Sequence, residues 1–191
     1  MISNGSDVAV IGLGYVGLPL AVSLAECGYF VRGIDVKSRL KEILETEEFG
    51  KNISTNLVPN LKKVLKNSHL KIGFNREVIE SCSVVIFCLP TPLNEKERPD
   101  PSILLNEIGR LKKYFKKGAL IIFESTVEPG FTGNVAIQLM RTQAKGLELD
   151  YAFSPERIDP LNEKWDVKNT PKLVAGLTDK ARDRAVEFYS K

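Results

Sequence analysis

Residues 12–17 read Gly12-Leu13-Gly14-Tyr15-Val16-Gly17, so three glycines stand at the spacing G-x-G-x-x-G. The spacing alone is a weak signal, because glycines gather in many kinds of turn. Its surroundings make it specific: an apolar run, residues 8–11, comes directly before it, and residues 16–27 carry apolar side chains at helical intervals. We therefore predict that this stretch forms the turn between a buried strand and a helix.

Each glycine has a physical role in such a turn. Gly12 permits the tight bend, Gly14 lets the backbone approach a pyrophosphate, and Gly17 lets the helix pack closely on the strand. The free N–H groups at the helix N-terminus favour an anion there. A structural glycine turn without a cofactor is the alternative. The predicted ligands of a dinucleotide diphosphate are Gly12, Leu13, Gly14, Tyr15, Val16 and Gly17.

A carboxylate follows the second predicted strand, residues 30–34. Asp35 comes directly after this strand and can accept hydrogen bonds from the hydroxyls of an adenosine ribose. Because Asp35 would repel a 2′-phosphate, the expected cofactor is NAD rather than NADP. Arg39 is close enough along the chain to lie over the adenine edge. Asp35 could instead cap the next helix, and Arg39 could be a solvated surface arginine.

The rest of the chain alternates short apolar runs with helical stretches, as a βαβ fold does. The sequence therefore predicts an α/β domain, a doubly wound and mostly parallel Rossmann sheet with helices on both faces. Ser102 is expected to be an N-cap. The predicted strands are 8–11, 30–34, 70–72, 84–88, 119–123, 151–153 and 172–175. The predicted helices are 16–27, 38–47, 61–66, 102–115, 131–145 and 179–189.

Length and composition bound the class of protein. The 191 residues suffice for one large domain, and 27 basic against 24 acidic residues leave a net charge of +3. That charge gives no argument for a nucleic-acid or membrane partner. The polar start lacks the features of a signal peptide, and no apolar run has the length of a membrane span. The three cysteines lack metal-ligand spacing, so we expect a cytoplasmic protein without a metal site.

Five segments together resemble one known family over essentially the whole chain. The first is Gly12–Pro19, which reads GLGYVGLP. The later ones are LPTP at 89–92 with Pro-Asp at 99–100, ESTVEPG at 124–130, SPERI at 154–158 and TPKLVAG at 170–176. In this order they are similar to the N-terminal NAD-binding domain of the UDP-glucose/GDP-mannose dehydrogenase family. No segment alone is specific for this family, whereas the combination of all five is highly specific for it.

The resemblance implies a two-step oxidation. Such enzymes convert the C6 alcohol of a nucleotide-linked sugar to a carboxylate and reduce two NAD⁺. In the family a cysteine attacks the aldehyde-level intermediate, and water hydrolyses the resulting thioester. Thr126 would contact the cofactor and position a water, and Glu156 would act with that water in proton transfer. Without the resemblance, Thr126 could simply cap a helix and Glu156 could be a solvated loop carboxylate.

Further roles carry over from the same segments. Pro90, Thr91 and Pro92 would line the nicotinamide half of the cofactor site, together with Ser125 and Thr126. Arg157 and Ile158 would face the sugar together with Glu156. The residues after Glu156 resemble the subgroup acting on N-acetylated sugars, UDP-N-acetylglucosamine or UDP-N-acetylmannosamine. A guanidinium can donate to an acetamido carbonyl, which permits this assignment without deciding it.

The chain departs from the family in length. Members are roughly twice as long and continue into a central helix, the nucleophilic cysteine and a second, UDP-binding domain. The resemblance matches none of Cys27, Cys82 and Cys88 to that nucleophile, and Cys88 is expected to be a core residue. Residues 1–191 are therefore expected to form only the NAD-binding domain, which binds NAD but is inactive alone. The full-length enzyme is expected to be a homodimer that takes a UDP-sugar.

Three other interpretations of the function stay open. The substrate could be UDP-glucose rather than an N-acetylated sugar. The chain could belong to an NAD enzyme of the hydroxyacyl or 6-phosphogluconate type, although the motifs at 91–92, 125–127 and 156 argue against it. It could also be a stand-alone NAD-sensing module without catalysis.

Overall fold

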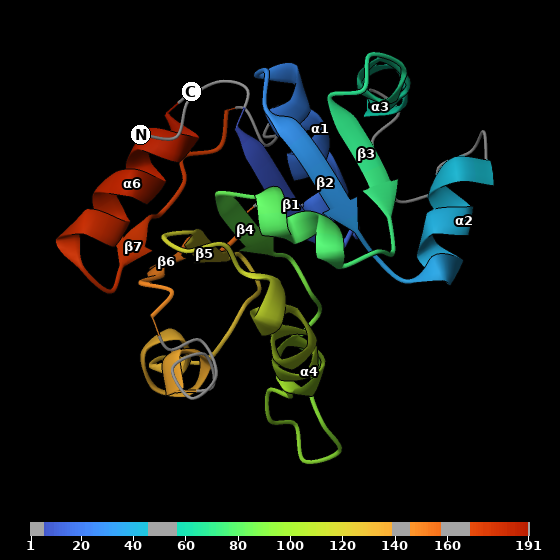
Figure 1. Cartoon of the computed structure of the whole chain (residues 1–191). Coiled ribbons are helices and arrows are strands. Elements are labelled where there is room, and N and C mark those ends of the chain that lie inside the picture. The colour runs from blue at the N-terminus through green and yellow to red at the C-terminus, as the bar shows by residue number, and fades with distance from the viewer. Residues whose placement is uncertain (1–5, 46–56, 139–145, 158–168, 191) are drawn as a thin grey trace.

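Within the described part of the chain, seven strands form one sheet in the order β3-β2-β1-β4-β5-β6-β7 (Figure 1). Their bounds are β1 Asp7–Ile11, β2 Phe30–Ile34, β3 Leu70–Gly73, β4 Val84–Phe87, β5 Leu120–Phe123, β6 Asp150–Phe153 and β7 Ala175–Gly176. The first six run parallel, and β7 pairs antiparallel with β6. The structure is a computed structural model that describes residues 6–45, 57–138, 146–157 and 169–190.

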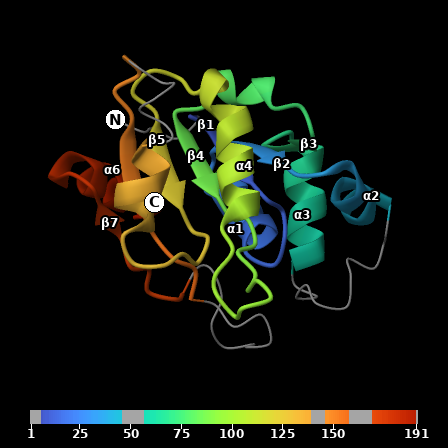
Figure 2. The same ribbon diagram turned by 90° about the horizontal axis from the view of Figure 1, so that it is seen from below.

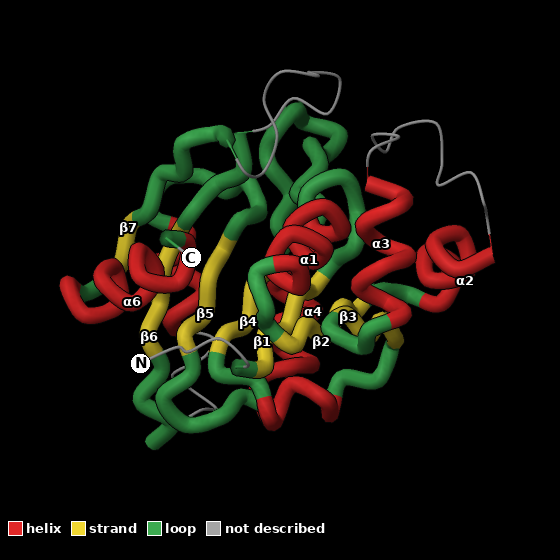
Figure 3. Tube along the Cα trace, turned by 90° about the horizontal axis from the view of Figure 1, so that it is seen from above, coloured by secondary structure: helices red, strands yellow, loops and turns green. Residues whose placement is uncertain are grey.

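Helices cover both faces of the sheet. The α-helices are α1 Gly17–Glu26, α2 Lys37–Glu45, α3 Leu57–Lys66, α4 Ser102–Leu111 and α6 Asp179–Tyr189. Buried side chains of α1, α3 and α6 share one hydrophobic cluster, and those of α4 share the other with the 3₁₀ helix η1 Glu77–Ser81. In Figure 3, α6, α1 and α3 follow one another along one face, and Figure 2 shows α4 lying across the other.

The central strands are apolar on both sides because both faces are covered. Within β4, Val84 and Ile86 belong to the cluster on the α1 side, whereas Val85 and Phe87 belong to the cluster on the α4 side. β5 alternates in the same way, and all four of its residues are buried. Such continuous apolar runs are typical of parallel strands with helices on both faces. The predicted doubly wound, mostly parallel Rossmann sheet is confirmed.

The strand order reverses direction between β1 and β4, which are neighbours in the sheet. The chain leaves β1 toward α1 on one face and leaves β4 toward α4 on the other face. The two connections therefore diverge at the carboxyl ends of these strands. In open α/β sheets this divergence creates the crevice in which ligands bind.

Several predicted helix boundaries were wrong. Ser102 is the first residue of α4 rather than its N-cap, because Oδ1 of Asp100 accepts hydrogen bonds from both the backbone N–H and the hydroxyl of Ser102. α4 ends at Leu111, and a separate 3₁₀ turn, η2 Lys112–Tyr114, follows it. α3 begins at Leu57, four residues before the predicted start at Leu61. The predicted helix 131–145 contains a π-helical stretch, η3 Thr132–Ala136, and its residues 139–145 lie outside the described residues.

The last strand was also misplaced. Residues 172–175 were predicted to form it, whereas β7 is only Ala175–Gly176. β7 pairs with β6 through Phe153–Ala175 and Ala152–Gly176. Lys172 lies before this contact, where its side chain is directed at two carboxylates rather than at a sheet face. The apolar residues at 173–175 favour a strand, but they do not show that Lys172 pairs with carboxylates.

Candidate functional site

The three glycines of the turn meet different surroundings. A Cβ on Gly12, whose φ is +93°, would lie 2.7 Å from the carbonyl oxygen of Cys88. A Cβ on Gly17 would lie 1.8 Å from the carbonyl oxygen of Gly12, so the helix start and the turn touch directly. A Cβ on Gly14 would meet no described atom within 4 Å. Gly12 and Gly17 are therefore required by packing, whereas Gly14 borders open space beside the turn.

The N-terminus of α1 faces this open space without a side-chain cap. Val16 is its N-cap residue and makes no side-chain capping bond, and the first turn of α1 carries no acidic residue. The first N–H groups of a helix have no partner within the helix itself, and the helix dipole makes this end partially positive. The site can therefore bind an anion such as a diphosphate.

Asp35 and Arg39 converge on the same turn. Oδ2 of Asp35 accepts a hydrogen bond of 2.6 Å from the backbone N–H of Leu13, and Oδ1 accepts one of 2.7 Å from Val36. Nε of Arg39 donates to the carbonyl oxygen of Leu13 at 3.2 Å. The structure thus brings both residues against the turn, where the adenosine half of a dinucleotide would follow its diphosphate.

The loops after β4 and β5 are tied to each other. The backbone N–H of Leu89 donates to Oγ of Ser125 at 2.9 Å, and Oγ1 of Thr91 donates to the carbonyl oxygen of Thr126 at 2.5 Å. Ser125 is buried, and its hydroxyl also donates to the carbonyl oxygen of Phe87 at 3.3 Å. Ser125 therefore fixes the two loops against each other.

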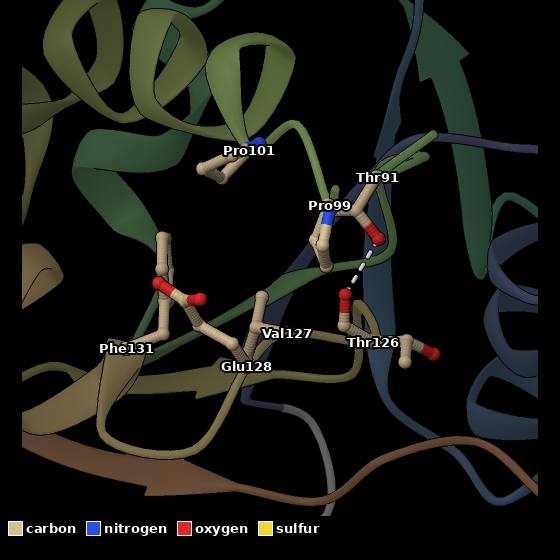
Figure 4. Close-up of a pocket in the computed structure, with 7 residues that line it drawn as sticks. All are labelled: Thr91, Pro99, Pro101, Thr126, Val127, Glu128 and Phe131. Atoms are coloured by element: carbon tan, nitrogen blue, oxygen red, sulfur yellow. Dashed lines mark hydrogen bonds between the residues drawn. The ribbon is translucent and has the colours of Figure 1, made fainter. Parts of the chain in front are cut away.

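A small pocket lies between these loops (Figure 4). The bond between Thr91 and Thr126 forms one side of it, and Glu128 and Phe131 lie on the other. Pro90 and Pro92 are exposed next to this pocket, and the carbonyl oxygen of Pro92 accepts a hydrogen bond of 2.7 Å from Asp100. The lining residues are Thr91, Pro99, Pro101, Thr126, Val127, Glu128 and Phe131.

A buried charge cluster adjoins the carboxyl end of β5. Nζ of Lys172 lies 2.8 Å from Oε1 of Glu124 and 3.0 Å from Oε2 of Glu156. The side chains are 13% exposed for Lys172, 0% for Glu124 and 7% for Glu156. The hydroxyl of Tyr189, the last residue of α6, donates to Oε1 of Glu124 at 2.5 Å. Glu156 is therefore held in place rather than exposed as a solvated loop carboxylate.

Within this cluster, burial and the attraction between opposite charges shift the pKa values of the side chains in opposite directions. Burial raises the pKa of Glu124, against the opposing attraction and hydrogen bonds of Lys172 and Tyr189. Burial alone would lower the pKa of Lys172, but the two carboxylates outweigh it and raise this pKa. Burial and the charge of Glu124 raise the pKa of Tyr189, so its hydroxyl stays a donor. Burial also raises the pKa of Cys88, which keeps this thiol protonated and unreactive.

Sequence reasoning missed Lys172, Glu124 and Tyr189 as members of the site. Glu124 and Lys172 lie inside two of the family-like segments, but they are 48 residues apart and nothing in either segment indicates the pairing.

The two residues predicted to follow Glu156 at the sugar have different outcomes. Arg157 is exposed, and its backbone N–H donates to Oε1 of Glu156 at 2.6 Å. Ile158 lies outside the described residues. Among the described residues, no helix has the length and apolar character needed to cross a bilayer.

Comparison with known proteins finds similar chains among nucleotide-sugar dehydrogenases. The UDP-N-acetyl-D-mannosamine dehydrogenase of Pyrococcus horikoshii is 32% identical over 186 residues, which cover 95% of this chain and 44% of that protein. The UDP-N-acetyl-D-glucosamine 6-dehydrogenase of Pseudomonas aeruginosa is 33% identical over 187 residues, covering 95% and 42%. The crystal structure of an NDP-N-acetyl-D-galactosaminuronic acid dehydrogenase from Methanosarcina mazei superposes with a TM-score of 0.88 at 29% identity, covering 98% and 42%.

The chain spans less than half the length of each of these relatives. The model of the UDP-glucose/GDP-mannose dehydrogenase family's NAD binding domain matches residues 6–191. The open space at Gly14, the uncapped start of α1 and the position of Asp35 all fit NAD as the cofactor. The chain therefore belongs to the UDP-glucose/GDP-mannose dehydrogenase family, in which it corresponds to the NAD-binding domain.

Proposed function

We propose that this chain is the NAD-binding domain of a UDP-N-acetylhexosamine 6-dehydrogenase of the cytoplasm. The whole enzyme would oxidise the C6 alcohol of the sugar to the uronic acid with two NAD⁺. The observation that carries the proposal is the open space at Gly14, bordered by the uncapped N-terminus of α1 and by Asp35. A dinucleotide bound there would extend its nicotinamide toward the loops after β4 and β5.

The residues near these loops have distinct roles in this proposal. Thr91 and Thr126, joined by their hydrogen bond, form a wall beside the nicotinamide. Glu156 accepts or releases a proton on a water that Thr126 helps to orient. Arg157, exposed directly after Glu156, is available to the sugar. When bound, NAD⁺ supplies the hydride acceptor, and the residues of this domain bind, orient and exchange protons.

The simplest test of binding is a calorimetric titration of the chain with NAD⁺. Gly14→Ala is expected to weaken the affinity at least about tenfold, because its methyl group would occupy the space of the diphosphate. Gly109→Ala in α4 is the matched control, since a Cβ there also meets no described atom within 4 Å. Equal affinities for both variants, or no binding by the unaltered chain, would refute the assignment of the turn.

Catalysis by the whole enzyme is proposed to need a region beyond this domain, which supplies the nucleophilic cysteine and the UDP site and makes the homodimer. The isolated chain mixed with NAD⁺ and a UDP-sugar is therefore expected to produce no NADH absorbance. Sustained turnover by the isolated chain would overturn this part of the proposal.

The proposed sugar is N-acetylated because the relatives named above act on UDP-N-acetylmannosamine and UDP-N-acetylglucosamine. Binding titrations of the whole enzyme with UDP-N-acetylglucosamine, UDP-N-acetylmannosamine and UDP-glucose test this choice. A clear preference for UDP-glucose would refute it.

A further inference from the structure

The buried cluster of Glu124, Lys172, Glu156 and Tyr189 lies one side chain away from the glycine turn. Cys88 is the connecting residue. A Cβ on Gly17 would lie 3.1 Å from Cβ of Cys88, and a Cβ on Gly12 would lie 2.7 Å from its carbonyl oxygen. On its other side, Cys88 is close enough to the cluster for the charges of Glu124 and Lys172 to act on its thiol. The charges therefore lie beside the predicted cofactor site rather than in a remote part of the core.

Glu124 has one carboxylate oxygen that the cluster does not use. Oε1 accepts hydrogen bonds from Lys172 and Tyr189, whereas Oε2 is buried and has no hydrogen-bond partner among the described residues. The side chain of Glu124 is 0% exposed, so water does not screen it. A charge in such surroundings acts over a longer distance than one at the surface. Keeping this carboxylate buried is costly, and the hydrogen bonds of Lys172 and Tyr189 offset that cost at Oε1 only.

The two redox states of the cofactor differ in charge at one place. The nicotinamide ring is positive in NAD⁺ and neutral in NADH, while the diphosphate and the adenosine are the same in both. A weakly screened charge near the ring therefore changes the ratio of the two affinities rather than the affinity common to both. A carboxylate favours the positive ring of NAD⁺, and an ammonium opposes it.

We infer that Glu124 determines redox-state specificity, because its buried carboxylate raises the affinity for NAD⁺ relative to NADH. The inference rests on the proposed function, in which the glycine turn binds the dinucleotide and the nicotinamide lies toward the ends of β4 and β5. The charge and hydrogen bond of Lys172 oppose the rise in the pKa of Glu124 that burial causes, and Tyr189 fixes the direction of its carboxylate. A domain tuned in this way binds its oxidised cofactor and releases the reduced one.

The test compares dissociation constants for NAD⁺, by calorimetry, and for NADH, by fluorescence. Glu124→Gln keeps the shape and removes the charge, so the ratio of the NADH to the NAD⁺ constant is expected to fall roughly three- to tenfold. Glu124→Asp keeps the charge and is expected to retain most of the ratio. Glu107→Gln is the matched control, because Glu107 is also mostly buried in an ion pair, with Arg76 at 2.7 Å on the α4 side of the sheet.

The outcomes separate the inference from the proposed function. No binding of either nucleotide by the unaltered chain overturns both. Binding of both with an unchanged ratio in Glu124→Gln overturns the inference alone. An equal loss of both affinities in Glu124→Gln and Glu124→Asp shows a merely structural role and also overturns it. Should Glu124→Gln not fold, Glu124→Met is a second neutral variant for the same comparison, in which Lys172 keeps Glu156 as its partner.

Discussion

At the scale of single residues, steric and electrostatic demands divide the site into parts that support the fold and parts that are proposed to face the dinucleotide. Gly17 belongs to the first kind because the start of α1 touches the carbonyl of Gly12. Gly14 belongs to the second kind because it borders open space. Asp35 serves both purposes, since it accepts the N–H of Leu13 and presents a carboxylate beside the turn. The spacing of the glycines alone does not separate these roles.

Gly17→Ala is expected to destabilise the domain by about 3 kcal/mol or more, because its Cβ would lie 1.8 Å from the backbone oxygen of Gly12. Denaturant unfolding checks this. Gly14→Ala serves as the control and is expected to retain nearly the full stability of the unaltered chain. A Gly17→Ala protein of unchanged stability would contradict the packing of the turn described above.

The buried thiol of Cys82 makes the stability of the domain depend on pH. The thiol is fully buried, and burial raises its pKa from 9.0 to about 12. Below pH 9 the thiol is protonated in both the folded and the unfolded chain. Between about pH 9 and 12 only the unfolded chain releases this proton, so the free energy of unfolding falls by about 1.4 kcal/mol per pH unit from this group. The stabilisation is thus present below pH 9 and is lost as the pH rises.

Replacement of Cys82 by Ala is expected to remove the contribution of one proton from the slope of the free energy of unfolding against pH. Denaturant unfolding at several pH values from 8 to 11 measures this slope. Cys27→Ala is the matched control, because Cys27 is exposed. Identical slopes for the Cys82→Ala variant and the unaltered chain would contradict the prediction.

At the scale of elements, α6 connects the edge of the sheet to the site. Arg184 donates to Asp150 of β6 and to the carbonyl oxygen of Gly118, and the ring of Phe188 packs 5.2 Å from that of Tyr29. Tyr189, at the end of the same helix, reaches Glu124. The sequence analysis predicted a helix over 179–189, which are its observed bounds, but only its packing shows that it supports the charge cluster.

Thr178 is the N-cap of α6, since its Oγ1 accepts a hydrogen bond of 3.1 Å from the backbone N–H of Ala181. Thr178→Ala is expected to cost about 1 kcal/mol of stability. Ser190→Ala, at the exposed end of the same helix, is expected to cost less. Thermal unfolding of the two variants compares them, and a larger loss for Ser190→Ala would argue against the cap.

At the scale of the whole molecule, the reversal of strand order between β1 and β4 brings distant segments to one crevice. The turn at 12–17 and the loops after β4 and β5 all lie at the carboxyl ends of parallel strands. Their hydrogen bonds join residues that are distant in the sequence, such as Leu89 and Ser125 or Thr91 and Thr126. A ligand in this crevice would therefore contact several parts of the chain at once and stabilise the folded state as a unit.

NAD⁺ at about 100 times its dissociation constant is expected to add about 2.7 kcal/mol of stability, which raises Tm by roughly 5–10 °C for a domain of this size. NADP⁺ at the same concentration is expected to raise Tm less, because its 2′-phosphate would face Asp35. A thermal shift assay with both nucleotides measures the difference. Equal shifts would show that Asp35 does not discriminate between the two cofactors.

The resemblance of five segments indicated the family. Local patterns in the sequence predicted three further features: the glycine turn, the apolar central strands and the acid after β2. These follow from residue types and spacings over a few positions, which is the range in which backbone sterics and hydrophobic periodicity act. Two features were visible only in the folded chain: Lys172 bridges Glu124 and Glu156, and β7 starts at Ala175. The reason is that an ion pair forms between side chains which the fold brings together, and nothing in the local sequence around a lysine shows which carboxylate will meet it.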